Sequence, residues 1–503
     1  MYRRFVLIVC VLTLGLLISS CNPSINMGYL PFPNGYDYME NLSTLNKATK
    51  EGNRKIIREH AWKLWAGIMQ PIGESNWPVW YTWPNTTAAF KAQSAEKILG
   101  ETDITQSRSG GSIIARNRDN GVKPSKMISE TEPRKYPCKN SDGQITICVN
   151  TPNAPSYDIV PSQVKKEYPT VIKNDKDNNE YIVDGSHFQY NGDIMIPTES
   201  LSLEGMNNIR ISQLYLTSKL DQLHKKKWPL EVTPLFIVTK HMYWPVKAQG
   251  VTAIPVWNND FPDDYTDYVG YETWNNLVGV DPSGKTVGKK EKVKFLYNVK
   301  DHGKEKDLPT KEQDALVYGL DSFYYHKITK EDWDSFDEAD KAILNAASYW
   351  ANNQPIGIGD YLVTIAMHIN TKELPSWTLQ SVWWSDKPDQ LPYAADRPEL
   401  PQAKGPWNHY LLTDAYAIPP NNKGEVDITV NPYIEGVIHP IATSCRNCHI
   451  RAGWPKGKVL GTASYQNPDC SDLLSYLTPE SKCLKPLTLT DYLWTIPDRA
   501  ISK

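Results

Sequence analysis

The sequence predicts an α+β fold, an antiparallel sheet with helices near both ends, and three observations lead to it. Apolar residues recur at three- to four-residue spacing over residues 51–70, as in an amphipathic helix. Short runs of β-type residues, separated by Pro, Gly and Asn, fill residues 235–297. Residues 359–385 alternate in character on both sides of a turn, which predicts a β-hairpin.

The expected helices follow from apolar spacing and from start and stop signals. Pro71 ends the first pattern, whose apolar face comprises Ile57, Ala61, Leu64, Trp65 and Ile68. Thr329, with Asp332 three positions later, is a typical helix start. The other expected helices cover residues 87–99, 204–226 and 329–351.

Strands and loops are expected between these helices. Residues 101–200 are polar and rich in turn-forming residues, so they predict long loops with short strands. Strands are expected at residues 235–239, 252–256, 276–280 and 292–297. We expect two lobes, with a boundary near residue 200 that separates a helical, loop-rich region, 51–200, from a sheet-containing region, 201–503.

The hairpin at residues 359–385 turns at residues 372–375 and has a tryptophan-rich surface. Side chains alternate between the faces of a strand. One face should therefore carry Tyr361, Val363, Ile365 and Met367, and the other Leu362, Thr364, Ala366 and His368. Met367 and His368 should lie on opposite faces.

The N-terminus has the pattern of an export signal. Arg3 and Arg4 precede an almost wholly apolar stretch over residues 5–18, which is too short to span a bilayer comfortably. Residues 18–21 end in Cys21 and resemble the lipobox of bacterial lipoproteins, in which cleavage precedes the cysteine and the cysteine is lipidated. A plain signal peptide with an incidental cysteine is the alternative. We expect a signal at 1–20 and a lipidated tether at 21–50, in a protein anchored to the bacterial cell envelope.

Length and charge limit the class of protein. With 503 residues, 40% of them hydrophobic, and 17 Trp, the chain can bury a large aromatic-rich core, so it is not a small all-α cytochrome domain. The formal charge of −3 argues against nucleic acid as a partner. Membrane contact is expected only through the lipid anchor, because no second apolar run reaches membrane length.

The most informative motif is Cys445-Arg446-Asn447-Cys448-His449, which has the spacing of a c-type haem attachment site. In such a site both thiols bond to the haem covalently, and the adjacent His is the proximal iron ligand. We expect one covalent haem c. The rival interpretations are a zinc site, a thioredoxin-like redox pair, and a disulfide with a bystander His. Zinc would need a second ligand pair at suitable spacing, and a redox pair would need a βαβ setting.

The remaining cysteines fit an exported protein. Of 8 Cys, Cys10 leaves with the signal, Cys21 is lipidated, and Cys445 with Cys448 holds haem. Pairing is the expectation for the other four in an oxidising compartment, as Cys138–Cys148 and Cys470–Cys483. The swapped pairing stays open, because sequence alone does not fix connectivity.

Several segments resemble a group of large exported bacterial c-type cytochromes that carry one haem motif near the C-terminus. They are residues 61–66, Met367 to Asn370 followed by Lys372, Pro375 to Trp377, and Asp491 to Trp494. The resemblance is patchy along the chain. It implies haem binding and export more than a type of reaction.

The second axial ligand must come from upstream, because no Met follows Met367 and only a short tail follows His449. His368 is the first candidate, ahead of Met367 and His439, and a five-coordinate iron stays open. The alternative for His368 is a hydrogen-bonded strand residue. His439 could equally pack against the haem helix, and His409 could be a core or surface residue.

Three functions are compatible with these features. The first is single-haem electron transfer, with a redox partner protein or a small-molecule electron donor or acceptor. The second is a haem-dependent oxidoreductase of peroxidase or oxygenase type with an open distal site. The third is a surface binding protein in which the haem has a structural role. Electron transfer is preferred because no acid–base group stands out beside the motif in the sequence.

Overall fold

The computed structural model describes residues 29–39, 41–72, 77–90, 134–139, 145–150, 160–174, 178, 180–192, 194–257, 268–269, 271, 274–295, 311–416, 418–422, 426–427, 429, 431–435, 437–438, 444–455 and 476–502. Within these ranges, the backbone alone is described for residues 134–139, 145–150, 268–269, 311, 437–438 and 483. Helices and mostly antiparallel sheets alternate along the chain, which confirms the α+β class.

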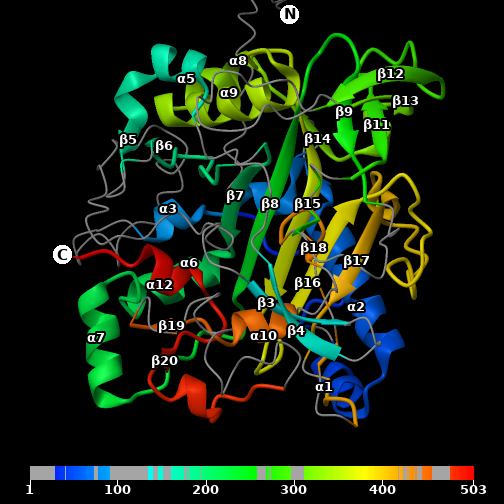
Figure 1. Cartoon of the computed structure of the whole chain (residues 1–503). Helices are drawn as coiled ribbons and strands as arrows, with labels where there is room; N and C mark the ends of the chain where they lie inside the picture. Colours follow the sequence, from blue (N-terminus) through cyan, green and yellow to red (C-terminus); the bar gives the residue numbers. More distant parts are fainter. Residues whose placement is uncertain are drawn as a thin grey trace, which may run out of the picture.

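The largest sheet has six strands and crosses the middle of the molecule (Figure 1). Its order is β17-β16-β15-β8-β7, with β14 also paired to β15, and all of these pairs are antiparallel. The strands are β7 (Ile196–Leu201), β8 (Ile237–Val246), β14 (Tyr325–Lys327), β15 (Tyr361–Thr371), β16 (Thr378–Trp384) and β17 (Tyr410–Asp414). The predicted hairpin is confirmed as β15 and β16.

A β-bulge in β15 changes the predicted alternation. The register between β15 and β8 shifts between Thr364 and Ala366, so Thr364 lies opposite Tyr243 and Ala366 opposite Met242. The hydroxyl of Thr364 contacts Nε2 of His241 at 2.8 Å, and His241 lies opposite Met367. Leu362 and Thr364 are therefore on the face of Met367, and Tyr361 and Val363 are on the face of His368. The predicted faces of these four residues are wrong, because a bulge adds one unpaired residue.

The two faces of this sheet pack against different parts of the chain. Two helices cover one face. Helix α2 (Arg54–Ile68) contacts β16 and β17, and helix α9 (Glu338–Asn352) contacts β7 and β8. On the other face, Leu201, Val238 and Leu379 form a second apolar cluster with Ile209, Leu220 and Ile496. Those three partners come from α6 (Leu203–Ile211), α7 (Thr217–Lys226) and α12 (Thr495–Arg499). The C-terminal segment thus closes the second face.

A four-stranded sheet continues from the end of β8. Its order is β12-β13-β11-β9, from β9 (Thr252–Pro255), β11 (Leu277–Val280), β12 (Lys290–Phe295) and β13 (Lys311–Tyr318). The pair β11 and β13 is parallel, which departs from the purely antiparallel expectation. The four strands predicted within 235–297 are confirmed, in the form of β8, β9, β11 and β12.

The remaining described elements are short. The helices are α1 (Leu42–Glu51), α3 (Thr86–Ala89), α5 (Ser162–Glu167), α8 (Lys330–Ser335) and α10 (Cys445–His449). The 3-10 helices are η1 (Val79–Thr82), η3 (Pro169–Val171), η5 (Leu320–Ser322), η6 (Trp407–His409) and η7 (Lys482–Leu484). Two-stranded pairs join β1 (Pro71–Ile72) to β2 (Trp77–Pro78), β3 (Arg134–Lys139) to β4 (Ile145–Asn150), β5 (Ile172–Asn174) to β6 (Glu180–Ile182), β10 (Tyr268–Val269) to β18 (Val437–Ile438) and β19 (Gly453–Trp454) to β20 (Thr488–Leu489).

The predicted helices lie where they were expected, but two of them are each divided into two shorter helices. The apolar face predicted for residues 51–70 is completely buried in α2. Residues 204–226 form two helices, because the chain turns at Gln213, where φ is +58°. Thr329 caps α8 as predicted, but Asp337 starts a second capping box and opens α9. Of the helix expected over 87–99, the described residues include only the beginning, in α3.

The expected tether and lobe boundary differ from the structure. Phe32 and Tyr36 are buried in the main core, and α1 packs on α2, so the part of the tether from residue 29 onward belongs to the folded body. The carbonyl of Leu30 accepts a 2.7 Å hydrogen bond from the indole of Trp83. The boundary expected near residue 200 falls within β7, which pairs with β8. Residues before and after this boundary share one apolar core.

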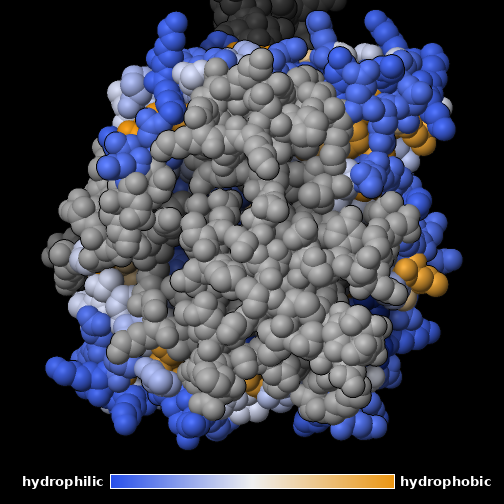
Figure 2. Space-filling view, in the orientation of Figure 1, coloured by the Kyte–Doolittle hydropathy of each residue, from blue (hydrophilic) through white to orange (hydrophobic). Residues whose placement is uncertain are grey.

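The described surface is mainly hydrophilic, with small separate hydrophobic groups on the face that Figure 2 shows. Exposed apolar side chains such as Ile211, Trp228 and Leu391 are scattered singly, which is normal for a folded protein. None of the helices within the described ranges has the length and apolarity needed to cross a bilayer.

His241 makes the fold sensitive to acid. It is completely buried, its ring stacks on Trp80 at 4.6 Å, and burial lowers its pKa to about 3. The unfolded chain binds a proton at this position below pH 6.5 while the folded chain does not, so stability falls as pH drops toward 3. We expect a loss of about 2 kcal/mol between pH 7 and 5, measured by denaturant unfolding.

The variant His241→Phe should lose this part of the pH dependence, because it has no group to titrate. The variant His224→Gln, at a partly exposed position on α7, is the matched control and should keep the wild-type slope. An unchanged slope in His241→Phe would show that another group causes the acid sensitivity.

Candidate haem attachment site

The predicted attachment motif forms one helical turn, α10. Cys445 and Cys448 are both free thiols, so the motif is not a disulfide with a bystander His. Arg446 is buried, donates to the carbonyl of Leu477 at 2.8 Å and stacks on Tyr476 at 4.0 Å. The turn is therefore fixed by its arginine, while neither thiol is in a disulfide.

His449 has the arrangement expected of a metal-ligating imidazole. Its Nδ1 lies 2.8 Å from the carbonyl oxygen of Tyr492, so this nitrogen donates and Nε2 keeps its lone pair. No hydrogen-bond partner occupies Nε2 within the part of the chain that the structure describes. Burial lowers the pKa of His449 to about 4, so the imidazole is neutral near pH 7.

The two thiols differ in exposure. Cys445 is half-buried, its backbone N–H donates to the hydroxyl of Thr429 at 2.8 Å, and burial raises its pKa. Cys448 is accessible to solvent, yet enough protein surrounds it that its pKa is raised as well. Both thiols are therefore protonated at neutral pH in this structure. A structural zinc site would need two further ligands beside them. No group of three or more metal-ligating side chains occurs among the described residues.

The residues present fit a haem c. Two thiols outside any disulfide and an imidazole with a free nitrogen lie on one turn. Beside Cys448, the buried indole nitrogen of Trp494 points to the thiol, and its hydrogen bond lowers the pKa of Cys448, against the larger effect of burial, which raises it.

A polar row crosses the large sheet near this motif. Cross-strand register aligns Glu199, Lys240, His368, Ser381 and Thr413 on β7, β8, β15, β16 and β17. Residues directly opposite each other share a face of the sheet. The charges of Lys240 and His368 both lower the pKa of His449, so this row lies close to the motif.

His368 lies near the motif, but both of its ring nitrogens are engaged. Nδ1 is 2.7 Å from the hydroxyl of Ser381, and Nε2 is 2.7 Å from a carboxylate oxygen of Glu435. The amide of Asn431 donates to the same Ser381 hydroxyl at 2.7 Å. His368 would have to leave Glu435 to bind iron. The alternative of a hydrogen-bonded strand residue describes its state in this structure.

The other axial candidates are less well placed or are not described. Met367 is completely buried on the opposite face of the sheet from His368, so the predicted separation of the two side chains is confirmed. His409 follows Trp407 in η6, and burial lowers its pKa. His439 lies outside the described residues.

The sequence analysis did not predict that Glu435 lies at this site, nor did it predict the contacts of Asp491. Glu435 gives no motif signal, because it meets His368 only through folding. Asp491 was quoted only as part of a resembling segment. In the structure it meets another of those segments, since it binds Lys372 at 2.6 Å and the indole of Trp377 at 3.2 Å.

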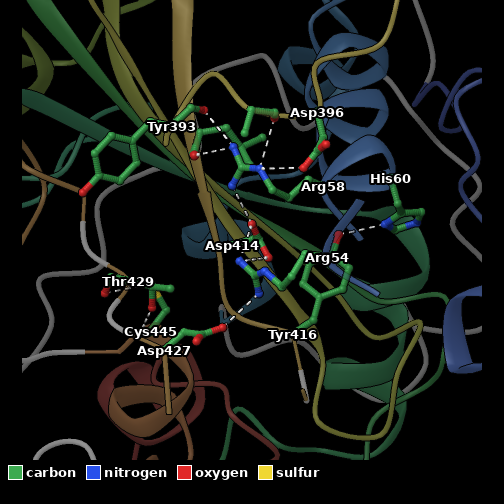
Figure 3. Close-up of polar contacts among 12 residues, drawn as sticks. Arg54, Arg58, His60, Tyr393, Asp396, Asp414, Tyr416, Asp427, Thr429 and Cys445 are labelled. Atoms are coloured by element: carbon green, nitrogen blue, oxygen red, sulfur yellow. Dashed lines mark hydrogen bonds and ion pairs between the residues drawn. The ribbon is translucent and has the colours of Figure 1, made fainter. Parts of the chain in front are cut away.

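An ion-pair cluster, buried at Arg58 and Asp414 and open to solvent at Arg54 and Asp427, lies next to the chain that leads to the motif (Figure 3). On α2, Arg58 donates to a carboxylate oxygen of Asp414 at 2.9 Å, and Arg54 lies 3.3 Å from the other oxygen. Arg54 also pairs with Asp427 at 3.0 Å, two positions before Thr429, the partner of Cys445. The cluster joins α2, β17 and the chain approaching α10.

The remaining predicted cysteines are only partly described. Cys21 and Cys470 lie outside the described residues, and of Cys483 in η7 only the backbone is described. The backbone around Cys138 and Cys148 forms a hairpin, with Cys138 opposite Thr146 and Cys148 opposite Tyr136. A Cys138–Cys148 disulfide would therefore join diagonal positions, and both disulfides stay predictions.

No family model matches the chain, and neither a curated protein nor a solved structure is similar enough to count as a match. The resemblance to exported c-type cytochromes stays a prediction.

Proposed function

We propose that the chain binds one haem c through Cys445 and Cys448, with His449 as proximal ligand, and that it transfers single electrons. The observation that carries the proposal is the contact of His449 Nδ1 with the Tyr492 carbonyl, on the same helical turn as two free thiols. Haem supplies the one-electron chemistry. The protein's part is to orient the imidazole, keep it neutral and surround it with protein.

We further propose that the protein is an exported lipoprotein, anchored to the bacterial cell envelope at Cys21. The N-terminal pattern supports this assignment, since a charged start, a short apolar stretch and a terminal cysteine occur in that order. Its partner would be a redox protein or a small-molecule electron donor or acceptor. Labelling with a radioactive or alkyne fatty acid, compared between the wild type and Cys21→Ser, tests the anchor.

A second function, a haem-dependent oxidoreductase of peroxidase or oxygenase type, is favoured by one observation. Glu435, His368 and Ser381 form a hydrogen-bonded group near the motif. While both nitrogens of His368 are engaged, that residue leaves the sixth position of an iron open. The pair could then hold or move a proton beside a bound substrate, as acid–base catalysis requires.

Absorption and EPR spectra with and without carbon monoxide distinguish the two functions. Electron transfer with His368 as ligand predicts a low-spin spectrum that carbon monoxide does not change. His368→Ala should then convert the iron to high spin, whereas His409→Ala, a half-buried His outside the polar row, should leave the spectrum unchanged. A wild-type protein that binds carbon monoxide, with a spin state unaffected by His368→Ala, would favour the oxidoreductase instead.

A further inference from the structure

We infer that Asp491 is a positioning residue for the haem ligand His449, and that Lys372 and Trp377 at the β15–β16 turn act through it. The inference rests on the proposed haem site. It assigns to the turn of the central hairpin a role in setting the reduction potential, although none of these three side chains belongs to the attachment motif.

Asp491 is held by donors from two separate segments. One carboxylate oxygen accepts from Lys372 Nζ at 2.6 Å and from Trp377 Nε1 at 3.2 Å. The other oxygen accepts from the backbone N–H of Val232 at 2.9 Å. The side chains of Lys372 and Asp491 are only 11% and 6% exposed, so solvent competes little for these bonds.

The backbone at this contact is strained. Asp491 and Tyr492 both adopt positive φ, 51° and 64°, and Trp377 has a φ of 65°. A non-glycine residue in this region is strained and persists only where its surroundings enforce it. Here the conformation turns the chain so that the Tyr492 carbonyl faces His449 Nδ1.

The same turn is tied to the haem helix from its other side. The N–H of Thr490 donates to the carbonyl of Ala452 at 2.9 Å, and the N–H of Ala452 donates to the carbonyl of His449 at 3.0 Å. The hydroxyl of Thr490 donates to the carbonyl of Leu493 at 2.9 Å. The Tyr492 carbonyl is thus fixed between the hairpin turn and α10.

The fixed carbonyl affects the ligand electronically. An N–H that donates a strong hydrogen bond makes the imidazole a more basic ligand, and a more basic ligand favours ferric over ferrous iron. Weakening the hold on Asp491 lets the Tyr492 carbonyl move away from Nδ1. The reduction potential should then rise.

The experiment compares Lys372→Met with Lys330→Met in the full chain, matured with haem. Lys330 is the matched control, because it also forms a 2.5 Å ion pair, with Asp334, but on the exposed helix α8. Covalent haem content and midpoint potential are measured for each. We expect unchanged haem content in both, and for Lys372→Met alone a tenfold shift of the reduction equilibrium toward ferrous iron, which equals about 59 mV for one electron.

Trp377→Phe provides a second variant that keeps the aromatic packing and removes only the N–H donor. Its potential should shift in the same direction by a smaller amount, about threefold in the equilibrium constant. Lys372→Arg, which keeps the cation, should retain the wild-type potential. If Trp377→Phe and Lys372→Met hold full haem at the wild-type potential, the positioning role is wrong. If the wild type itself carries no covalent haem, the proposed function fails instead.

Discussion

The double variant Cys445→Ala with Cys448→Ala is expected to lose covalent haem completely. Each thiol can form one thioether bond, so the single variants should keep one bond each and the double variant none. The measurement is haem absorption that stays with the polypeptide after denaturation and acid–acetone extraction, in a host that matures c-type cytochromes. The expected signal for the double variant is at background.

The double variant Cys138→Ala with Cys148→Ala is the matched control, because it also removes two cysteines but leaves the motif intact. It should retain full covalent haem, even if loss of the predicted disulfide lowers stability. Haem that remains bound to Cys445→Ala with Cys448→Ala after denaturation would contradict the assignment of these thiols.

The variant Arg58→Leu is expected to lower the free energy of unfolding by about 3–5 kcal/mol. Arg58 has a 9% exposed side chain, and its partner Asp414 is completely buried. Its guanidinium also donates to three backbone carbonyls, those of Tyr393, Ala395 and Leu412. Removing it takes one donor from each of three carbonyls and leaves the buried Asp414 carboxylate with Arg54 as its remaining cation, which denaturant unfolding should detect.

The exposed pair of Lys330 and Asp334 supplies the comparison, since both side chains are more than half exposed. Lys330→Met should change the free energy of unfolding by less than about 1 kcal/mol. A loss in Arg58→Leu as small as that of the control would mean that the contacts of Arg58 contribute little to holding α2 on β17.

Local patterns in the sequence predicted most of the individual elements. The helix at α2, the capping residue Thr329 and the β15–β16 hairpin depend on neighbours within a few positions, and each was found as expected. The attachment motif is also local, because Cys445, Cys448 and His449 need only one helical turn to come together.

Contacts between distant segments could not be predicted in this way. The β-bulge that moves Thr364 to the other face leaves no mark on the alternation of residues 361–368. The contact of Glu435 with His368 and that of Asp491 with Lys372 depend on how the C-terminal segment closes over the sheet. The tether prediction failed because Pro, Gly and Asn also occur in ordered turns, and Phe32 and Tyr36 pack into the core.

The most direct test of the account is the intact mass of the full chain, produced in a host that exports and matures c-type cytochromes. After denaturation, we expect the wild-type polypeptide to be heavier by the mass of one haem. The double variant Cys445→Ala with Cys448→Ala should have its unmodified mass. A wild-type chain at its unmodified mass, in a host that loads haem on a known c-type cytochrome in parallel, would contradict the central claim.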